Sequence, residues 1–520
     1  ISIMKKILYP FLIISLIIGF VACSDDLETA PTDRVAGNVI FETTDGAQVA
    51  MDGIYRMLYS SGWSIGNEHQ NFGIMSTKMF TSLMGEDFLQ DAQGNGWFYF
   101  DYRYDVRSRY TATSWRSYAT WAFYYQLISN ANYILAEEEN LGGDPAVVDN
   151  IMAQAYAIRA YSYFQLIQLF QQTYIGNQTA PGVPLYTEAT TAASEGKGRG
   201  TVEEVYTQIN LDLDDAIAKF KSAGLSQSHI SHIDLYVANA IKANVSLVQN
   251  KWGDAAKYAK DALDKPGREM LKASEIHEGF NDAKTKDVLW GAEIIADQSS
   301  VYASFFSHMD ARADRYARSS RKCIYNWLYD QIPSIDARKK WWQDPNGPDV
   351  GKSNHNIAYN QHKFLYAEID GDLGDYIFMR KAEMQLVYAE ALCHDQKYPE
   401  AKAALEELLK RRRDDWATVL DGVTMSNELT MGSIGSAKTL MDHIILQRRI
   451  ELWGEAERIF DLQRLKMGFD RGSKAGGSNH SDFLSAFDSK VPASKEFILT
   501  IPQKEFDGNP NMSPSDQNPM

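Results

Sequence analysis

The chain has 520 residues, of which 44% are hydrophobic and 12% aromatic, so it can supply a large buried core. Its formal net charge of -16 argues against a nucleic-acid-binding protein, because contacts to phosphates need clustered lysine and arginine. Only three cysteines occur, and none has the C-x-x-C spacing of a zinc framework.

The first residues have the pattern of an export signal. Two lysines precede an apolar run, residues 7–22, that is too short to cross a membrane as a mature helix. Cys23 follows this run directly, which resembles the bacterial lipobox, in which the thiol receives a diacylglycerol. We therefore expect a signal peptide at residues 1–22, lipidation at Cys23 and a flexible acidic tether at residues 23–32. The alternative is an ordinary cleaved signal followed by a chance cysteine.

Helical periodicity begins near residue 43 and recurs through much of the chain. Apolar side chains repeat at three- and four-residue spacing over about 113–138, 146–171 and 440–466, which predicts three long helices. We expect the helical scaffold to comprise about 43–265 and 376–470.

One further predicted helix has a clear start signal. Thr201 and Glu204 have the spacing of a capping box, in which the side chain of each residue accepts a hydrogen bond from the backbone N–H of the other. The helix that begins there carries an apolar stripe from Val205 to Phe220.

Two stretches of the scaffold repeat one arrangement. Predicted helices at about 237–249 and 377–394 are each followed by a tight turn with an aromatic residue, Trp252 or Tyr398, and then by an alanine-rich segment. Tetratricopeptide-type hairpins have this pattern, and two generic helix hairpins would also give it. The fold we predict is mainly α: a tetratricopeptide-like helical-hairpin scaffold with long loop-rich insertions and few short strands.

Two stretches, about 71–110 and 266–375, lack sustained helical periodicity. They are rich in aspartate, asparagine, serine, glycine and aromatic residues, and only residues 288–295 read as a short strand. Long structured loops are uncommon unless they are functional, so we expect the ligand-binding site in these two insertions.

The first insertion combines aromatic and polar side chains in a pattern suited to sugars. Sugars have flat C–H faces ringed by hydroxyls, which proteins bind with exposed aromatic rings and surrounding polar groups. Trp97, Tyr99 and Tyr102 lie in such a run, and Asp87 precedes it. We predict that these four residues bind the ligand. The alternative is a twisted strand that buries about half of the rings in the core.

The second insertion offers the same combination of residues. We predict that Tyr302, Arg315 and Trp327 contribute to ligand binding there. We also predict that Cys323 and Cys393 are buried free thiols, and the alternative is a disulfide between them. Four carboxylates between residues 368 and 375 form either a calcium loop or a solvated acidic turn. Their spacing is not that of an EF-hand, so we favour the turn and expect no metal or other cofactor.

Several segments, taken in order, resemble the SusD/RagB family of surface lipoproteins, which bind nutrients beside an outer-membrane transporter in Bacteroidetes. The resemblance extends over essentially the whole mature chain. The segments are Cys23-Ser24-Asp25-Asp26, Trp115 to Asn132, Arg159 to Leu166, Pro181 to Leu185, Arg380 to Leu386, Arg448 to Leu452, Arg458 to Leu462 and Ile501 to Glu505.

The resemblance implies a single SusD-like domain over residues 33–520, attached only by lipid to the outer membrane at the cell surface. It also implies that the protein captures oligosaccharides and delivers them to a SusC-like TonB-dependent transporter. The family motifs are mostly scaffold. In them, Arg380 with Glu383 and Arg458 with Asp461 have the i,i+3 spacing of polar clamps within or between helices.

Catalytic motifs are sparse. No H-E-x-x-H zinc motif and no P-loop occurs, so we expect a binding protein and no enzyme. The first alternative is a secreted glycoside hydrolase. The two catalytic carboxylates of such an enzyme are recognised by their distance in space, which the sequence does not give. A peptide-capturing relative of the same family is the second.

Overall fold

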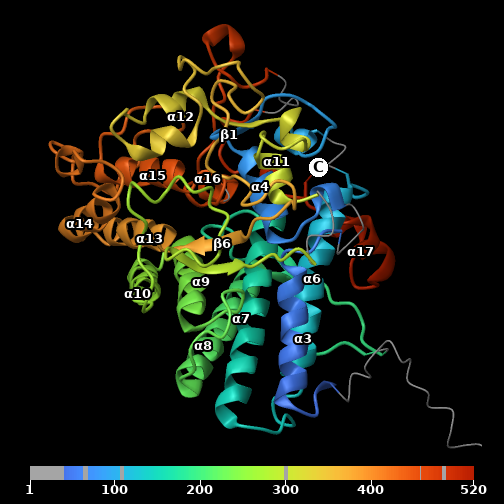
Figure 1. Ribbon diagram of the computed structural model, residues 1–520. Helices are drawn as coiled ribbons and strands as arrows, with labels where there is room; N and C mark the ends of the chain where they lie inside the picture. The colour runs from blue at the N-terminus through green and yellow to red at the C-terminus, as the bar shows by residue number, and fades with distance from the viewer. Residues whose placement is uncertain are drawn as a thin grey trace, which may run out of the picture.

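The computed structural model describes residues 40–62, 68–105, 111–191, 193–297, 303–456, 458–482 and 488–519. Long helices stand side by side in the lower half of Figure 1, and segments rich in loops and short helices occupy its upper half. The predicted mainly helical fold is confirmed.

Four helices form the first part of the scaffold: α3 (Thr44–Met57), α6 (Trp115–Leu135), α7 (Pro145–Phe170) and α8 (Val202–Ala223). Helix α7 packs against α3, α6 and α8. The predicted capping box of α8 is confirmed, because the Thr201 side chain accepts from the Glu204 N–H and the Glu204 carboxylate accepts from the Thr201 N–H.

Two helix hairpins continue the scaffold. The first consists of α9 (Leu235–Val248) and α10 (Trp252–Leu263), and the second of α13 (Lys381–His394) and α14 (Tyr398–Leu409). Helix α10 packs against α13, so the two hairpins lie side by side although the second insertion separates them in the sequence. The tetratricopeptide-like character of these hairpins stays a prediction.

The strands form three antiparallel pairs. Strand β1 (Phe88–Gln90) pairs with β5 (Lys322–Ile324), β2 (Pro181–Pro184) with β3 (Arg199–Thr201), and β4 (Val288–Ala292) with β6 (Tyr376–Arg380). Strand β4 confirms the short strand predicted near residue 288. The remaining helices are α4 (Ile74–Met84), α5 (Tyr99–Tyr102), α11 (Phe305–Met309), α12 (Asn326–Asp330), α15 (Leu440–Glu451), α16 (Arg458–Arg464) and α17 (Gln503–Gly508).

Two predicted helix boundaries are wrong. The helix predicted from residue 377 begins only at Lys381, because the preceding residues form the buried strand β6. The long helix predicted over 440–466 is two helices, α15 and α16. Between them Gly454 has φ of +75°, and a Cβ there would lie 2.7 Å from the Phe364 ring, so the turn requires glycine.

The C-terminal segment returns to the middle of the scaffold. The Leu499 N–H donates to the Leu169 carbonyl at 2.7 Å, and Nδ2 of Asn518 donates to the Phe170 carbonyl at 2.7 Å. Residues 499–518 therefore bind the carbonyls at the C-terminal end of α7, which α7 cannot satisfy internally.

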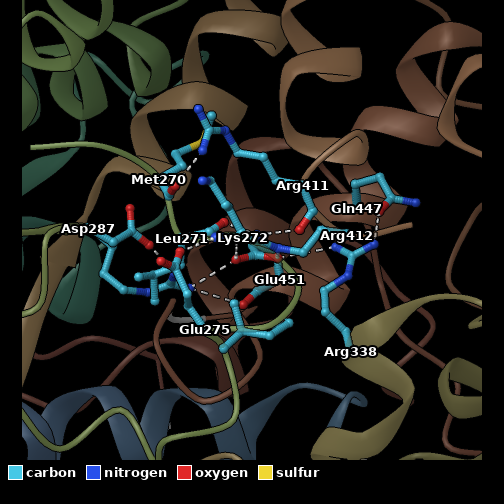
Figure 2. A network of polar contacts seen from close by, with 12 residues as sticks. Met270, Leu271, Lys272, Glu275, Asp287, Arg338, Arg411, Arg412, Gln447 and Glu451 are labelled. Atoms are coloured by element: carbon cyan, nitrogen blue, oxygen red, sulfur yellow. Dashed lines mark hydrogen bonds and ion pairs between the residues drawn. The ribbon is translucent and has the colours of Figure 1, made fainter. Parts of the chain in front are cut away.

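A buried carboxylate, Glu451 at the end of α15, joins three parts of the chain. It accepts hydrogen bonds from Arg412 at 2.8 Å on both oxygens, from Arg338 at 3.3 Å and from Arg380 at 3.2 Å. Figure 2 shows Arg338, Arg412 and Gln447 around it. These arginines belong to the second insertion, to the turn after α14 and to β6, so Glu451 holds the insertion on the helical scaffold.

Arg380 and Arg458, the arginines of the family motifs, form their ion pairs with other residues than the i,i+3 partners predicted from the sequence. Arg380 binds Asp287 at 2.6 Å and Glu455 at 2.5 Å, besides Glu451. Arg458 binds Glu86 at 2.8 Å, whereas Asp461 binds Arg448 and Arg464. These residues are polar clamps that join distant segments. A buried charge is costly unless an opposite charge neutralises it, and here the opposite charges lie on neighbouring packed elements.

Two further observations concern the whole described chain. Cys323 and Cys393 are buried free thiols, as predicted. Among the helices of the described residues, none is long and apolar enough to span a bilayer.

We predict that Glu451→Ala lowers the free energy of unfolding by about 3–5 kcal/mol, because it leaves three buried guanidinium groups without their shared carboxylate. The measurement is chemical denaturation followed by circular dichroism. Asp261→Ala is the control, since Asp261 pairs with Lys257 on the exposed face of α10 and its loss should cost less than about 1 kcal/mol. Equal losses in the two variants would contradict the central role of Glu451.

Candidate ligand-binding surface

The fold brings the two predicted insertions together. In the β1–β5 pair, Phe88 lies opposite Ile324 and Gln90 opposite Lys322. Beyond the strands, Arg321 binds Asp91 through both its backbone N–H and its guanidinium, across 230 residues of sequence. The first and second insertions thus form one continuous surface.

Three aromatic rings meet at this junction: His69 and Trp97 are stacked, and Tyr316 lies edge-on to His69 with an interplanar angle of 83°. The His69 and Trp97 rings lie parallel, with centroids 4.8 Å apart and an interplanar angle of 9°. Nδ1 of His69 lies 2.5 Å from the hydroxyl of Tyr316, which is 247 residues away in the sequence. On the inner side, the buried His308 ring stacks on Tyr316 at 4.5 Å. We call His69, Trp97 and Tyr316 the aromatic stack.

Backbone geometry aims Trp97 at His69. Gly94 and Gly96 have φ of +52° and +88°, and Phe98 also adopts a left-handed conformation with φ of +60°. The Phe98 N–H donates to Oε1 of the buried Gln70 at 2.6 Å, which ties the turn to the segment that carries His69. The twisted strand considered as the alternative does not form over residues 97–104, which make a tight turn followed by the one-turn helix α5.

A buried ion pair supports this turn from below. Arg116 of α6 binds both oxygens of Asp101, at 3.1 and 2.8 Å, and also donates to the Gln70 carbonyl. Its guanidinium lies 5.0 Å from the Phe98 ring centroid. The aromatic stack is thus fixed to a long scaffold helix, which favours a preformed site.

The exposure of the stack suits contact with a ligand. Trp97 and Phe100 are half-buried, so each ring keeps an exposed part, whereas Tyr316 is buried. Among the described residues, the indole N–H of Trp97 has no hydrogen-bond partner although the atom is buried. The exposed part of the Trp97 ring is the aromatic area that a ligand could contact, whereas its N–H is enclosed.

Arg315 lies next to this stack. It binds Asp372 through two hydrogen bonds, at 2.7 and 2.9 Å, and remains half-buried. Arg318 and Asp314 form a more exposed pair at 2.7 Å. These charged pairs line the edge of the aromatic stack and can donate to or accept from hydroxyl groups.

Trp327 occupies a separate position. It is half-buried and lies under the Arg449 guanidinium, 4.8 Å from the ring centroid. Among the described residues, no direct ring contact joins Trp327 to the aromatic stack. The predicted binding residues Trp97 and Trp327 therefore do not form one platform.

Asp87 is a structural residue, which corrects its predicted role. It is buried and binds Arg449 through both carboxylate oxygens, while its carbonyl accepts from the Trp453 indole at 2.8 Å. Burial raises the pKa of the Asp87 carboxyl, although Arg449 opposes the rise. The carboxylate is enclosed by the scaffold and cannot reach a ligand in this conformation.

Tyr102 and Tyr99 also need correction. Tyr102 is only 1% exposed, and its hydroxyl lies 2.9 Å from Nδ1 of His480 and accepts from the Ser481 N–H. Tyr99 is 9% exposed and lies under the Arg103 guanidinium. Helix α5 turns both rings toward the core, so they support the surface and do not form it.

Three predictions lie outside the described residues. Tyr302, the lipidation site Cys23 and the signal and tether at residues 1–32 are not among the residues that the structure describes. These remain predictions.

Sequence reasoning missed His69. A single histidine beside Glu68 has no periodic or motif signal, and its importance follows only from contacts with Trp97 and Tyr316. Tyr316 stands among the aromatic residues of the second insertion, but nothing in the sequence distinguishes it from its neighbours.

The acidic segment at residues 368–375 forms a compact turn. Glu368 pairs with Leu373, Asp372 binds Arg315, and Asp375 accepts from the N–H groups of Ala283 and Ile294. Within the described parts of the chain, no three His, Cys, Asp or Glu side chains converge as metal ligands. The carboxylates of Asp372 and Asp375 are thus already bound by donor groups of the protein itself.

Two family models match the chain. One, described as starch-binding and associating with the outer membrane, matches residues 69–233, and the model of the SusD family matches residues 264–520. The chain belongs to the SusD family. His69 and Trp97 lie in the first match and Tyr316 in the second, so the stack joins the two matched regions.

Relatives of known sequence and structure agree with this assignment. SusD-like protein P2 of Formosa agariphila is 25% identical, over 98% of this chain and 99% of that protein. A SusD-like carbohydrate-binding protein from Bacteroides vulgatus has a TM-score of 0.74 at 23% identity, covering 92% of this chain and 99% of that one. A laminarin-binding SusD-like protein has a TM-score of 0.65 at 19% identity, covering 92% and 100%. These matches indicate no catalytic family.

A buried lysine beneath the surface predicts a pH dependence of stability. Lys322 in β5 is fully buried, and its Nζ donates to the Ser320 carbonyl. Burial lowers its pKa to about 7, with Asp91 opposing the shift. Between pH 7 and 10.5 the unfolded chain therefore holds a proton that the folded chain releases, so stability rises with pH.

We predict that Lys322→Met raises the melting temperature most below pH 7, and that the gain shrinks toward pH 10. Differential scanning fluorimetry at several pH values measures this difference. Lys363→Met is the matched control: Lys363 is also buried but binds Glu455, so its replacement should lower the melting temperature at neutral pH. A rise in the melting temperature of Lys322→Met that is the same at every pH would contradict the lowered pKa of Lys322.

Proposed function

We propose that this SusD-family chain is a lipid-anchored, cell-surface protein that captures oligosaccharides and delivers them to a SusC-like TonB-dependent transporter. The observation that carries the proposal is the aromatic stack, which two distant insertions build and Arg116 fixes from below. The matched family of starch-binding proteins and the similar laminarin-binding protein support a glycan as the ligand.

The geometry of the stack favours sugars over other ligands. The half-buried Trp97 ring offers an apolar face for sugar C–H groups, and the paired charges at Arg318 and Arg321 surround it with hydrogen-bonding groups. Affinity should be modest, since an open surface buries little area and sugar hydroxyls lose water on binding.

The glycoside hydrolase alternative would need two free carboxylates facing the ligand. The Gly-x-Ser-x-Gly pattern at residues 62–66 is that of serine hydrolases, which cleave esters and amides, so it does not support a glycosidase. Of these residues the structure describes only Gly62, which follows helix α3 and not a strand. Around the aromatic stack, the described carboxylates of Asp91, Asp314 and Asp372 are each bound to an arginine. Such pairs favour binding over acid–base catalysis.

Two observations support the proposed membrane attachment. Cys23 follows a lipobox-like sequence, and the first matched family associates with the outer membrane. A thioether-linked lipid would hold the chain at the surface without a spanning helix.

We predict that Trp97→Ala reduces glycan binding at least tenfold with little change in melting temperature, because Trp97 is only partly buried at the margin of the core. The measurement is affinity electrophoresis of the purified protein in gels that contain starch, laminarin or other candidate polysaccharides. Trp252→Ala is the matched control, since Trp252 is also half-buried and stacks on a histidine, His394, at 4.0 Å on the helical scaffold.

Equal retardation of the two variants would reject the aromatic stack as the binding surface. In the same samples, a reducing-end assay separates capture from hydrolysis: a steady release of new reducing ends would overturn the proposed function in favour of the hydrolase.

For the anchor, we predict that Cys23→Ser abolishes incorporation of labelled palmitate and releases the protein from the membrane fraction. Cys323→Ser is the control, because that thiol is buried in β5 and should leave labelling unchanged. Labelling that persists in Cys23→Ser would contradict lipidation at this residue.

A further inference from the structure

A small cavity lies where the turn between α15 and α16 meets the first insertion. Its volume is about 20 Å³, and since about 10–15 Å³ suffices for a water molecule, it has space for one water molecule or one monatomic ion. Ser82 of α4, Phe88 of β1 and Gly454 of the turn contribute to its lining. These elements lie near one another in the upper half of Figure 1, and α16 packs against α4.

Two buried arginines that line this cavity each have one nitrogen without a partner. The side chains of Arg448 and Arg458 are only 9% and 5% exposed. In both of them Nη1 is buried and has no hydrogen-bond partner among the described residues. An unpaired buried donor is costly, and more so on a charged group, so these two nitrogens require an acceptor.

The carboxylates beside the two arginines bind other nitrogens of the guanidinium groups. Both oxygens of Asp461 accept from Nε of Arg448, at 3.2 and 2.9 Å. Glu86, which does not line the cavity, accepts from Nε and Nη2 of Arg458, at 3.3 and 2.8 Å. The protein therefore pairs one side of each guanidinium and leaves Nη1 of both for a further acceptor.

The side chains that line the cavity carry more positive than negative charge. Three guanidinium groups, those of Arg448, Arg449 and Arg458, stand against two carboxylates, those of Asp87 and Asp461. A hydrogen bond from a guanidinium to an anion is roughly twice as strong as one between neutral groups. The unpaired nitrogens thus favour an anion over a neutral acceptor.

A halide ion also fits the available hydrogen bonds better than a water molecule. A halide only accepts, whereas a water molecule that accepts from both arginines must still donate its own two hydrogens. The carboxylate oxygens of the lining are already engaged: those of Asp87 accept from Arg449, and those of Asp461 from Arg448. An anion of several atoms, such as sulfate, exceeds the space of one water molecule.

We infer that this cavity binds one chloride ion, held by Nη1 of Arg448 and Nη1 of Arg458. The ion joins α15 and α16 to the start of β1, the strand that pairs with β5 and so unites the two insertions. No residue of the aromatic stack lines the cavity, so the ion stabilises the scaffold beneath the proposed glycan-binding surface without competing with a glycan.

Bromide tests the site directly in the unmodified protein, because it replaces chloride and scatters X-rays anomalously. Crystals of the purified protein grown in sodium bromide, without chloride, should show an anomalous peak in contact with Nη1 of Arg448 and of Arg458. A water molecule at this position, or bromide only at the surface of the molecule, would overturn the inference.

The ion should also stabilise the protein in solution. At one ionic strength of about 0.15 M, sodium chloride should raise the melting temperature by about 2 °C over sodium gluconate, whose anion is too large for the cavity. Arg448→Met should abolish this rise, and Asp461 keeps Arg464 as its partner in that variant. The matched control is Arg318→Met, which removes an exposed arginine paired with Asp314 and should keep the rise.

The two experiments together decide between a built site and chance binding. Equal chloride effects in Arg448→Met and Arg318→Met would indicate a general salt effect and refute the inference. A bromide peak without stabilisation of the unmodified protein by chloride would mark an adventitious ion only, which refutes it equally. If Arg448→Met does not fold, the bromide peak and the chloride effect on the unmodified protein still decide the outcome.

Discussion

The structure depends on one buried charge balance, in which Glu451 is shared by Arg338, Arg380 and Arg412. Burial alone would raise the pKa of this carboxyl, but Arg412, Arg380 and Arg338 hold it well below its ordinary value. An ion pair in the core adds little net stability compared with apolar packing, yet the loss of one member is costly. One carboxylate cannot balance three guanidinium groups, so Arg338 also pairs with Asp336, and Arg380 also pairs with Asp287 and Glu455. The second insertion, the helix hairpins and β6 pack in the arrangement that gives each of these arginines a carboxylate.

The same principle positions the proposed glycan-binding surface. Arg116 and Asp101 fix the turn that carries Trp97, and Arg321 and Asp91 extend the contact between the insertions beyond the β1–β5 pair. These pairs hold the backbone in place, and so does the pair of Arg449 with Asp87, which the sequence suggests as a ligand contact. Fewer aromatic side chains are exposed on this surface than its composition suggests. Trp97, which remains partly exposed, lies on a turn that these pairs hold rigid.

The local part of the fold could be read from the sequence. Periodicity located α6 and α7 to within a few residues, and the spacing of Thr201 and Glu204 gave the start of α8. Contacts between distant residues could not be read in this way. Asp87 looks like a rim carboxylate until Arg449 is placed beside it, and His69 gains a role only from Tyr316, 247 residues further on. The break between α15 and α16 depends on the Phe364 ring against Gly454, which no helical pattern records.

The return of residues 499–518 to the end of α7 has a consequence for how the protein matures. Because a polypeptide is synthesised from its N-terminus, these residues emerge late. Until then the terminal carbonyls of α7, among them those of Leu169 and Phe170, lack their native donors. Completion of the central helix layer thus awaits nearly the whole polypeptide, and a prematurely ended chain would carry an unfinished scaffold that cellular proteases can recognise.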